Sequence, residues 1–218
     1  MKNLKLFILL AFISSYTLSF GQSKLEIGFE IGPGIPTLRG SGFFENNRLI
    51  TLGYSGGVSL QYNLSESFAL KTGLNFERKG SKQKLMLLCI SDESSKGATS
   101  KFNLNYITVP VLSRFSGGEK VKYFVDAGMF VGYLLNAQVI TEYFNKTETS
   151  NSTKYRKKGD FGTSIGIGAL VPIKDKIRLS IELKNNHGFI NIDKNPINDN
   201  LSIKTNITKL LIGLQYSL

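Results

Sequence analysis

Apolar and polar residues alternate along most of this chain, and the alternation continues to its last residue. In the final stretch, KLLIGLQYSL, one side of an extended strand would carry Leu210, Ile212, Leu214, Tyr216 and Leu218. A period of two places successive side chains on opposite faces of a β-strand, which gives one apolar and one polar face. Chain ends that pair with nothing usually fray, so we expect this segment to pair with another strand.

Eight segments carry this pattern, and we expect each to form one strand of an antiparallel sheet. They are 24–31, 51–64, 68–79, 102–115, 123–135, 160–171, 177–184 and 209–218. The connections alternate between long (33–50, 80–101, 136–159 and 191–205) and short (63–67, 116–120 and 172–176). This layout is typical of outer-membrane barrels, which have short periplasmic turns and long extracellular loops. The sequence therefore predicts an all-β, eight-stranded, up-and-down transmembrane barrel with both termini in the periplasm.

Residues 1–21 have the features of a secretory signal peptide. Lys2 and Lys5 precede an apolar run over 6–13, and the letters SFG close the segment as a small-x-small cleavage site. The apolar run is too short to span a bilayer as a helix. We expect the mature chain, 22–218, to form a single barrel domain, and loss of the two lysines lowers its net charge from +11 to +9.

The composition of the polar face indicates that this face points inward. It is rich in Gly and Ser and carries charges of both signs, which suits a narrow barrel interior where acids pair with bases. A soluble barrel would instead fill its interior with the large apolar residues, and its wet surface would gain nothing from so much glycine. We therefore expect the apolar face to contact lipid, with aromatic residues near the strand ends. The charges expected inside are Glu26, Glu30, Lys71, Glu77, Asp126, Asp160, Arg178, Glu182, Lys184 and Lys209.

The fourth segment, 102–115, is the hardest to assign. It is apolar on both faces over 107–112, and Pro110 within it lacks the amide that a strand ladder needs. We expect a β-bulge in this stretch.

Several segments resemble the PorT-like outer-membrane β-barrel family of Bacteroidota. The similar stretches are LNYITVPVLSRF (104–115), VGYLLNA (131–137), KKGDFG (157–162) and IELKNNHGFINI (181–192). The resemblance implies an eight-stranded barrel in a Gram-negative outer membrane, without shared catalytic residues. The family's named member is linked to protein secretion and gliding, a role that membership alone does not transfer.

We expect no catalytic residue, metal site or cofactor. Cys89 is the only cysteine, which excludes an internal disulfide, and the chain has no Cys/His cluster for a metal. His187 is the only histidine, and it is close in sequence to Asp193 and Ser202. Some outer-membrane enzymes use His, Asp and Ser together, so a lipid-modifying enzyme stays open as an alternative.

Basic residues gather in the third long connection at Lys154, Arg156, Lys157 and Lys158. Placed above an outer membrane, they could attract anionic lipopolysaccharide, or they could be solvated residues that bind nothing in particular. Nucleic acid is a poor candidate partner, because the other basic residues are dispersed among strands and the compartment is wrong.

The sequence thus predicts a non-enzymatic outer-membrane protein that serves as a structural or binding component, or as an accessory subunit of an envelope complex such as a secretion complex. The expected partners are outer-membrane lipid, lipopolysaccharide, the barrel-assembly machinery and an envelope protein complex. A small diffusion channel is the main alternative, although side chains fill an eight-stranded barrel. Leu218 stands where such barrels commonly end on an aromatic residue.

Overall fold

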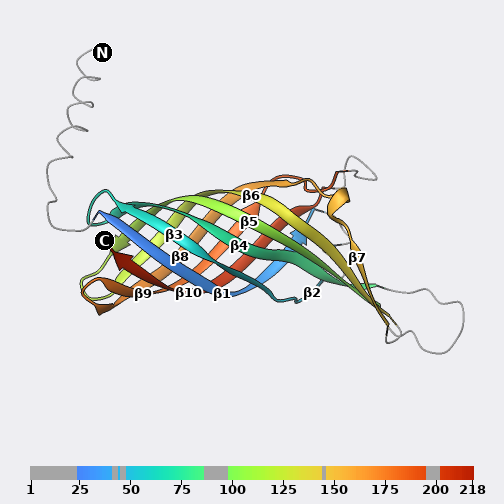
Figure 1. The fold of residues 1–218 in the computed structure, drawn as a ribbon, viewed down its shortest axis with the longest axis horizontal. Helices are drawn as coiled ribbons and strands as arrows, with labels where there is room; N and C mark the ends of the chain where they lie inside the picture. Colours follow the sequence, from blue (N-terminus) through green and yellow to red (C-terminus); the bar gives the residue numbers. More distant parts are fainter. Residues whose placement is uncertain (1–23, 41–43, 45–47, 86–97, 144–145, 195–201) are drawn as a thin grey trace, which may run out of the picture.

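The computed structural model describes residues 24–40, 44, 48–85, 98–143, 146–194 and 202–218. Almost all of them lie in strands that wrap around one elongated barrel (Figure 1). The predicted signal peptide and Cys89 lie outside the described residues. Within the described ranges, no helix is long and apolar enough to cross a membrane.

Eight strands form the barrel, each antiparallel to its neighbours, and the predicted eight-stranded antiparallel barrel is confirmed. They are β1 (Leu25–Arg39), β3 (Gly53–Asn63), β4 (Phe68–Leu85), β5 (Ala98–Gly117), β6 (Lys122–Tyr143), β8 (Gly159–Lys174), β9 (Ile177–Gly188) and β10 (Lys204–Ser217). Two shorter strands extend the sheet, β2 (Arg48–Leu49) beside β4 and β7 (Lys146–Asn151) beside β6. A 3-10 turn, η1 (Thr153–Tyr155), follows β7.

Pairing between the first and last strands closes the barrel. β10 pairs with β1 from Glu26 opposite Ser217 to Arg39 opposite Lys204. The amide of Leu218 donates to the carbonyl of Leu25 at 3.1 Å. The alternation therefore continues to the chain end because the last strand has a partner along its whole length and leaves no free edge.

The strands are staggered around the barrel. A path that follows the paired residues from Ile27 crosses every one of the eight barrel strands and returns to β1 at Thr37, ten residues further on. Such a stagger requires the strands to tilt strongly against the barrel axis, by about 35–45°. The path passes through Leu60, Thr72, Val111, Met129, Thr163, His187 and Asn206.

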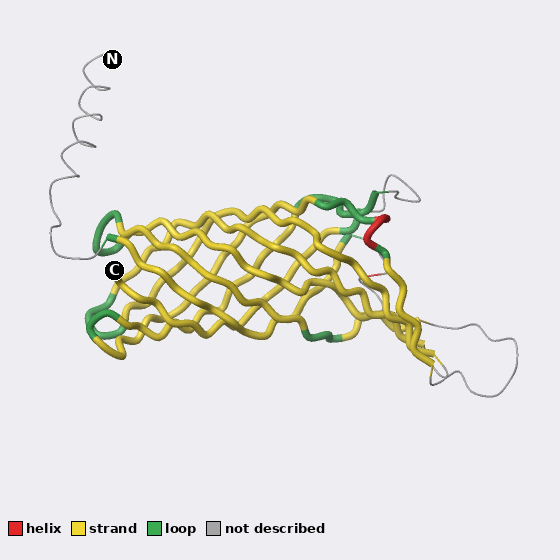
Figure 2. The backbone as a smooth tube through the Cα atoms, in the orientation of Figure 1, coloured by secondary structure: helices red, strands yellow, loops and turns green. Residues whose placement is uncertain are grey.

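The two ends of the barrel differ. At the short-turn end, the connections are those after β3, β5 and β8. At the opposite, long-loop end, β4, β5, β6 and β7 continue as a twisted sheet that projects past the other strands (Figures 1 and 2). The long connections predicted at 80–101 and 136–159 are therefore partly strand, because their polar residues gave no apolar face to recognise.

The fourth barrel strand, β5, is more regular than predicted. Its register shifts between Asn105 and Tyr106, which lies in the segment 102–115 where a bulge is predicted and just before the apolar run 107–112. From Tyr106 onward the alternation is unbroken, and Pro110 lies opposite Phe130. The Pro110 carbonyl accepts a hydrogen bond from Thr72 Oγ1 at 2.8 Å. Residues of the apparent apolar run therefore alternate between the outward face of β5, which would contact lipid, and its inward face.

Candidate functional site

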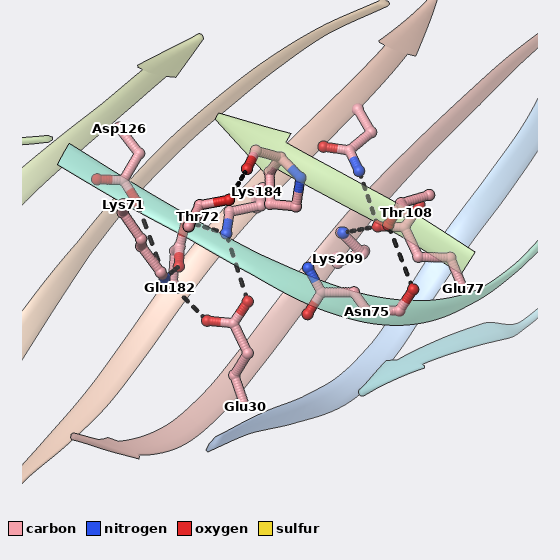
Figure 3. A network of polar contacts seen from close by, with 12 residues as sticks. Glu30, Lys71, Thr72, Asn75, Glu77, Thr108, Asp126, Glu182, Lys184 and Lys209 are labelled. Carbon is pink, nitrogen blue, oxygen red and sulfur yellow. Dashed lines mark hydrogen bonds and ion pairs between the residues drawn. The ribbon is translucent and has the colours of Figure 1, made fainter. Parts of the chain in front are cut away.

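The polar face of the sheet points inward and carries a network of ion pairs (Figure 3). Six acidic and six basic side chains take part, and they come from every barrel strand except β3. They are Glu26, Glu30, Glu77, Asp126, Asp160, Glu182, Lys71, Lys79, Arg114, Arg178, Lys184 and Lys209. Because the two signs balance, the charge excess of the chain lies outside this network.

The middle of the interior holds the densest part of the network. Arg114 donates two hydrogen bonds of 2.7 Å to the carboxylate of Asp126, and both side chains are at most 1% exposed. Lys71 bridges Glu30 at 2.9 Å and Glu182 at 3.3 Å. Lys184 lies 3.0 Å from Glu182, which completes a chain of alternating charges across β1, β4 and β9. A buried charge is tolerated only when it is paired in this way.

A second group of pairs lies toward the long-loop end. Glu77 pairs with Lys209 and accepts a hydrogen bond from Asn186 at 2.8 Å. Lys79 bridges Asp160 at 2.9 Å, and Asp160 also accepts from Thr205 at 2.7 Å. Each buried carboxylate is thus held by partners on strands remote in sequence.

Near the short-turn end, Glu26 forms the last pair. It pairs with Arg178 and accepts a hydrogen bond from Asn63 Nδ2 at 2.6 Å. Gln61 connects the groups, because it reaches Glu26 and also accepts from Arg114 Nη1 at 3.0 Å. The network therefore extends along most of the barrel.

Glycine makes room for these side chains. A Cβ atom at Gly166 would clash with the carboxylate of Glu182, and one at Gly57 would clash with the side chain of Asn75. At these two positions glycine has a steric cause, which is the crowding of polar side chains in a narrow barrel.

An apolar plug lies beside the charges at the long-loop end. Its members come from the inner face of β1, β5 and β6 and from the connections after β1 and β9. The plug consists of Leu38, Phe44, Leu104, Tyr106, Leu134, Ala137, Ile192 and Ile203, each at most 8% exposed. Lys79 joins plug and network, because its Nζ lies 5.1 Å from the Tyr106 ring centroid. Together they fill the interior with packed side chains.

All the charges expected inside lie in this network, which also contains two residues that the sequence analysis missed. Arg114 and Lys79 are among the most buried side chains of the chain. The signal for Arg114 is the alternation of β5 continued from Tyr106, which places it on the inner face. Lys79 follows Glu77 at the same two-residue spacing in β4.

The basic residues of the third connection separate into two kinds. Arg156 is only 9% exposed and lies 3.4 Å from Asp193, so it is not part of the exposed basic surface. Lys154, Lys157 and Lys158 are exposed; Lys154 lies over the Tyr155 ring and Lys158 over the Tyr133 ring.

The residues considered for an enzyme are not assembled into a site. His187 is on the outward face of β9, and its ring lies 5.8 Å from that of Phe189. Asp193 is paired with Arg156 instead. In the described part of the chain, no group of three or more His, Cys, Asp or Glu residues is placed to hold a metal ion.

Comparison with known proteins gives the family. The family model described as "Outer membrane protein beta-barrel domain" matches residues 20–194, which is most of the chain. The chain belongs to this outer-membrane β-barrel family. The match ends before β10, the strand that closes the barrel. No curated protein matches the sequence.

Several solved outer-membrane proteins are similar to this outer-membrane barrel. Neisserial surface protein A is 12% identical with a TM-score of 0.49, and the match covers 91% of this chain and 99% of that one. Ail, the attachment invasion locus protein of Yersinia pestis, is 12% identical with a TM-score of 0.44, covering 88% and 97%. OprG from Pseudomonas aeruginosa is 6% identical with a TM-score of 0.45, covering 91% and 99%.

The outer-membrane barrel carries a continuous apolar belt on its outer face. Large apolar side chains there are roughly half exposed, among them Phe29, Val58, Leu74, Val131 and Ile167. Water would make so large an apolar surface unfavourable, whereas lipid accepts it. The same alternation of apolar and polar residues thus produces both the outer belt and the paired charges of the interior.

Proposed function

We infer that this protein is a closed, non-enzymatic outer-membrane barrel that acts as a structural or binding component of the envelope. Its long-loop end faces the cell exterior, and both termini and the short turns lie in the periplasm. The observation that carries this inference is the filled interior, in which balanced ion pairs and the apolar plug occupy the space that a pore would need.

The same observation argues against a diffusion channel. Six carboxylates and six basic groups are bound to one another, so moving an ion through the barrel would require these pairs to separate. Breaking a buried pair costs about 3–5 kcal/mol. An aqueous channel usually requires about 16 strands, because side chains cannot fill the lumen of a barrel that wide.

The binding role would be exerted at the long-loop end, where the sheet of β4 to β7 projects. The exposed Lys154, Lys157 and Lys158 favour contact with lipopolysaccharide, and the projecting sheet offers a surface to a protein of an envelope or secretion complex. A place in the PorT-like group of Bacteroidota would fit this accessory role. Assembly into the membrane would depend on the barrel-assembly machinery.

Planar-bilayer recording tests this function. Purified protein in a bilayer is expected to give no discrete conductance steps, because ion pairs and the apolar plug occupy the interior. The matched sample is the same preparation after heat unfolding, which sets the level of leakage from unfolded chain. Reproducible unitary steps seen only with the folded barrel would refute the closed-barrel function.

A crosslinking pull-down from outer-membrane fractions tests the accessory role. A reproducible envelope protein captured through the projecting sheet would support it, and capture of lipid alone would leave the barrel as a stand-alone component.

A further inference from the structure

A pocket of about 560 Å³ opens at the long-loop end, outside the barrel interior. Its size falls in the range of small-molecule sites. It lies between β6, β7, the η1 turn and the start of the connection after β9. We call it the loop pocket, and its lining includes Val139, Ser152, Lys154, Tyr155, Arg156 and Asp193.

The walls of the loop pocket are fixed by hydrogen bonds. Thr153 Oγ1 accepts from the Ala137 amide at 2.9 Å, and the Ser152 amide donates to the Ala137 carbonyl at 2.9 Å, which ties η1 to β6. On the other side, Arg156 and Asp193 form a β-bridge, and the Lys194 amide donates to the Tyr155 carbonyl at 3.1 Å. The pocket is therefore preformed, which reduces the entropy that a ligand would lose on binding.

The polar chemistry of the loop pocket centres on Arg156. This side chain is buried, yet among the described residues its Nε and Nη1 have no hydrogen-bond partner. Its contact with Asp193 is an ion pair of 3.4 Å at Nη1. Buried donors of this kind are costly unless a ligand satisfies them.

The charges around the loop pocket favour an anion. Lys154 and Arg156 supply two positive charges against the single carboxylate of Asp193. An arginine fork matches the oxygen geometry of phosphate, and a phosphate monoester brings nearly two negative charges and three acceptor oxygens. A carboxylate ligand carries only about half the negative charge of a phosphate monoester, so it would be attracted less strongly to a pocket that already contains the Asp193 carboxylate.

The uncharged part of the wall indicates the rest of the ligand. Tyr155 presents a half-exposed ring, Val139 adds an apolar side chain, and Ser152 adds a hydroxyl. An aromatic ring beside hydroxyl donors suits the apolar face and the hydroxyl groups of a sugar. We propose that the loop pocket binds a phosphorylated sugar, with its phosphate on Arg156 and Lys154 and its ring against Tyr155.

Calorimetric titration tests the site directly. The barrel in nanodiscs of phosphatidylcholine is titrated with glucose 1-phosphate, and with glucose as the uncharged control. Glucose 1-phosphate is expected to bind, and glucose is not. Arg156→Gln is expected to weaken the binding of glucose 1-phosphate about tenfold to hundredfold, which is the loss that follows when a charge-assisted hydrogen bond is removed. Lys154→Gln should weaken it less, and Lys176→Gln, at the short-turn end, should leave it unchanged.

The Asp193→Asn variant separates a ligand site from a structural ion pair. If the pocket receives an anion, removing the competing carboxylate should tighten binding several-fold. If Arg156 and Asp193 serve only to hold the two connections together, the variant should weaken binding or abolish it. Unchanged binding in Arg156→Gln, equal binding of glucose, or no binding of either probe would overturn the proposal. Retained heat-modifiable gel migration shows that each variant is folded.

Two sources could supply the phosphorylated sugar, a free metabolite or the glycan of lipopolysaccharide. Nanodiscs that contain lipopolysaccharide should block glucose 1-phosphate binding if the lipid is the source, and dephosphorylated lipopolysaccharide should not. Absence of competition would assign the pocket to soluble sugar phosphates. The assignment to lipopolysaccharide rests on the proposed placement of the long-loop end at the cell surface, whereas binding of the soluble probe does not. A conducting barrel that still binds the probe would therefore refute the closed-barrel function alone.

Discussion

Replacing Asp126 by alanine is expected to lower the free energy of unfolding by about 3–5 kcal/mol, because it leaves Arg114 charged and unpaired in the barrel interior. Arg114 donates both of its bidentate hydrogen bonds to Asp126 at 2.7 Å, and neither side chain is more than 1% exposed. The nearby carboxylate of Glu182, at 3.9 Å from Arg114, is already bound to Lys71 and Lys184. It therefore cannot replace the lost partner. Urea titration of the barrel in lipid vesicles measures the change.

Two variants serve as controls for this experiment. Glu142→Ala breaks an ion pair with Lys82 that is 3.5 Å long and partly exposed to solvent, so it is expected to cost less than about 1 kcal/mol. The double variant Arg114→Met, Asp126→Leu removes both charges and should recover most of the stability, because a packed apolar pair avoids the desolvation of two ions. If Asp126→Ala costs no more than Glu142→Ala, the interior charges are not sequestered as the structure indicates.

Replacing Ile212 by arginine is expected to destabilise the barrel in a bilayer by about 2–4 kcal/mol, the cost of placing a basic side chain on a lipid face near the midplane. Ile212 is near the middle of β10 and is half exposed on the outer face. Its neighbours across the two adjacent strands are Ile31 and Ile181, so no acidic group is available there to pair with an introduced charge. Urea titration in vesicles again gives the value.

Leu64→Arg is the matched control for the lipid-face variant. Leu64 has a similar exposure, but it lies in the turn after β3, where an arginine side chain reaches water. It should change the stability by less than about 1 kcal/mol. Equal costs at Ile212 and Leu64 would contradict a lipid-facing belt, since a water-facing surface would accept arginine at both positions.

The barrel itself could be predicted from the sequence because a period of two needs no knowledge of distant contacts. The alternation of 209–218 and of 24–31 predicts two strands. A closed barrel has no free edge, so its first and last strands must pair. Glycine and charged residues on one face indicate that this face points into the barrel, because only a crowded interior needs both. These inferences depend on local pattern and on general limits of β-structure in lipid.

Other features could not be predicted because they arise from the closed barrel. The sequence does not show that Arg114 meets Asp126 or that Lys79 meets Asp160, since these pairs depend on the ten-residue stagger of the strands. The apolar plug joins Phe44 and Ile192 from separate connections, and neither lies in an alternating segment. Three-dimensional closure, rather than local pattern, brings them together.

The loop pocket shows a different limit of sequence-based prediction. The basic residues at 154–158 predict one charged surface, although the chain there makes a 3-10 turn and a β-bridge. The bridge buries Arg156 while its neighbours stay exposed. Composition gives the charge of such a segment but not which side chain faces a cavity.

In the barrel described above, the apolar face of every barrel strand lies in lipid around a filled interior. Spin labels placed at Leu60, Ile167 and Ile212, with Cys89 replaced by serine, measure this directly through collision with oxygen and with a water-soluble nickel complex. All three positions are expected to show high oxygen and low nickel accessibility in vesicles, while a label at Leu64 should show the reverse. High nickel accessibility at the three belt positions would place this face in water and contradict the claim.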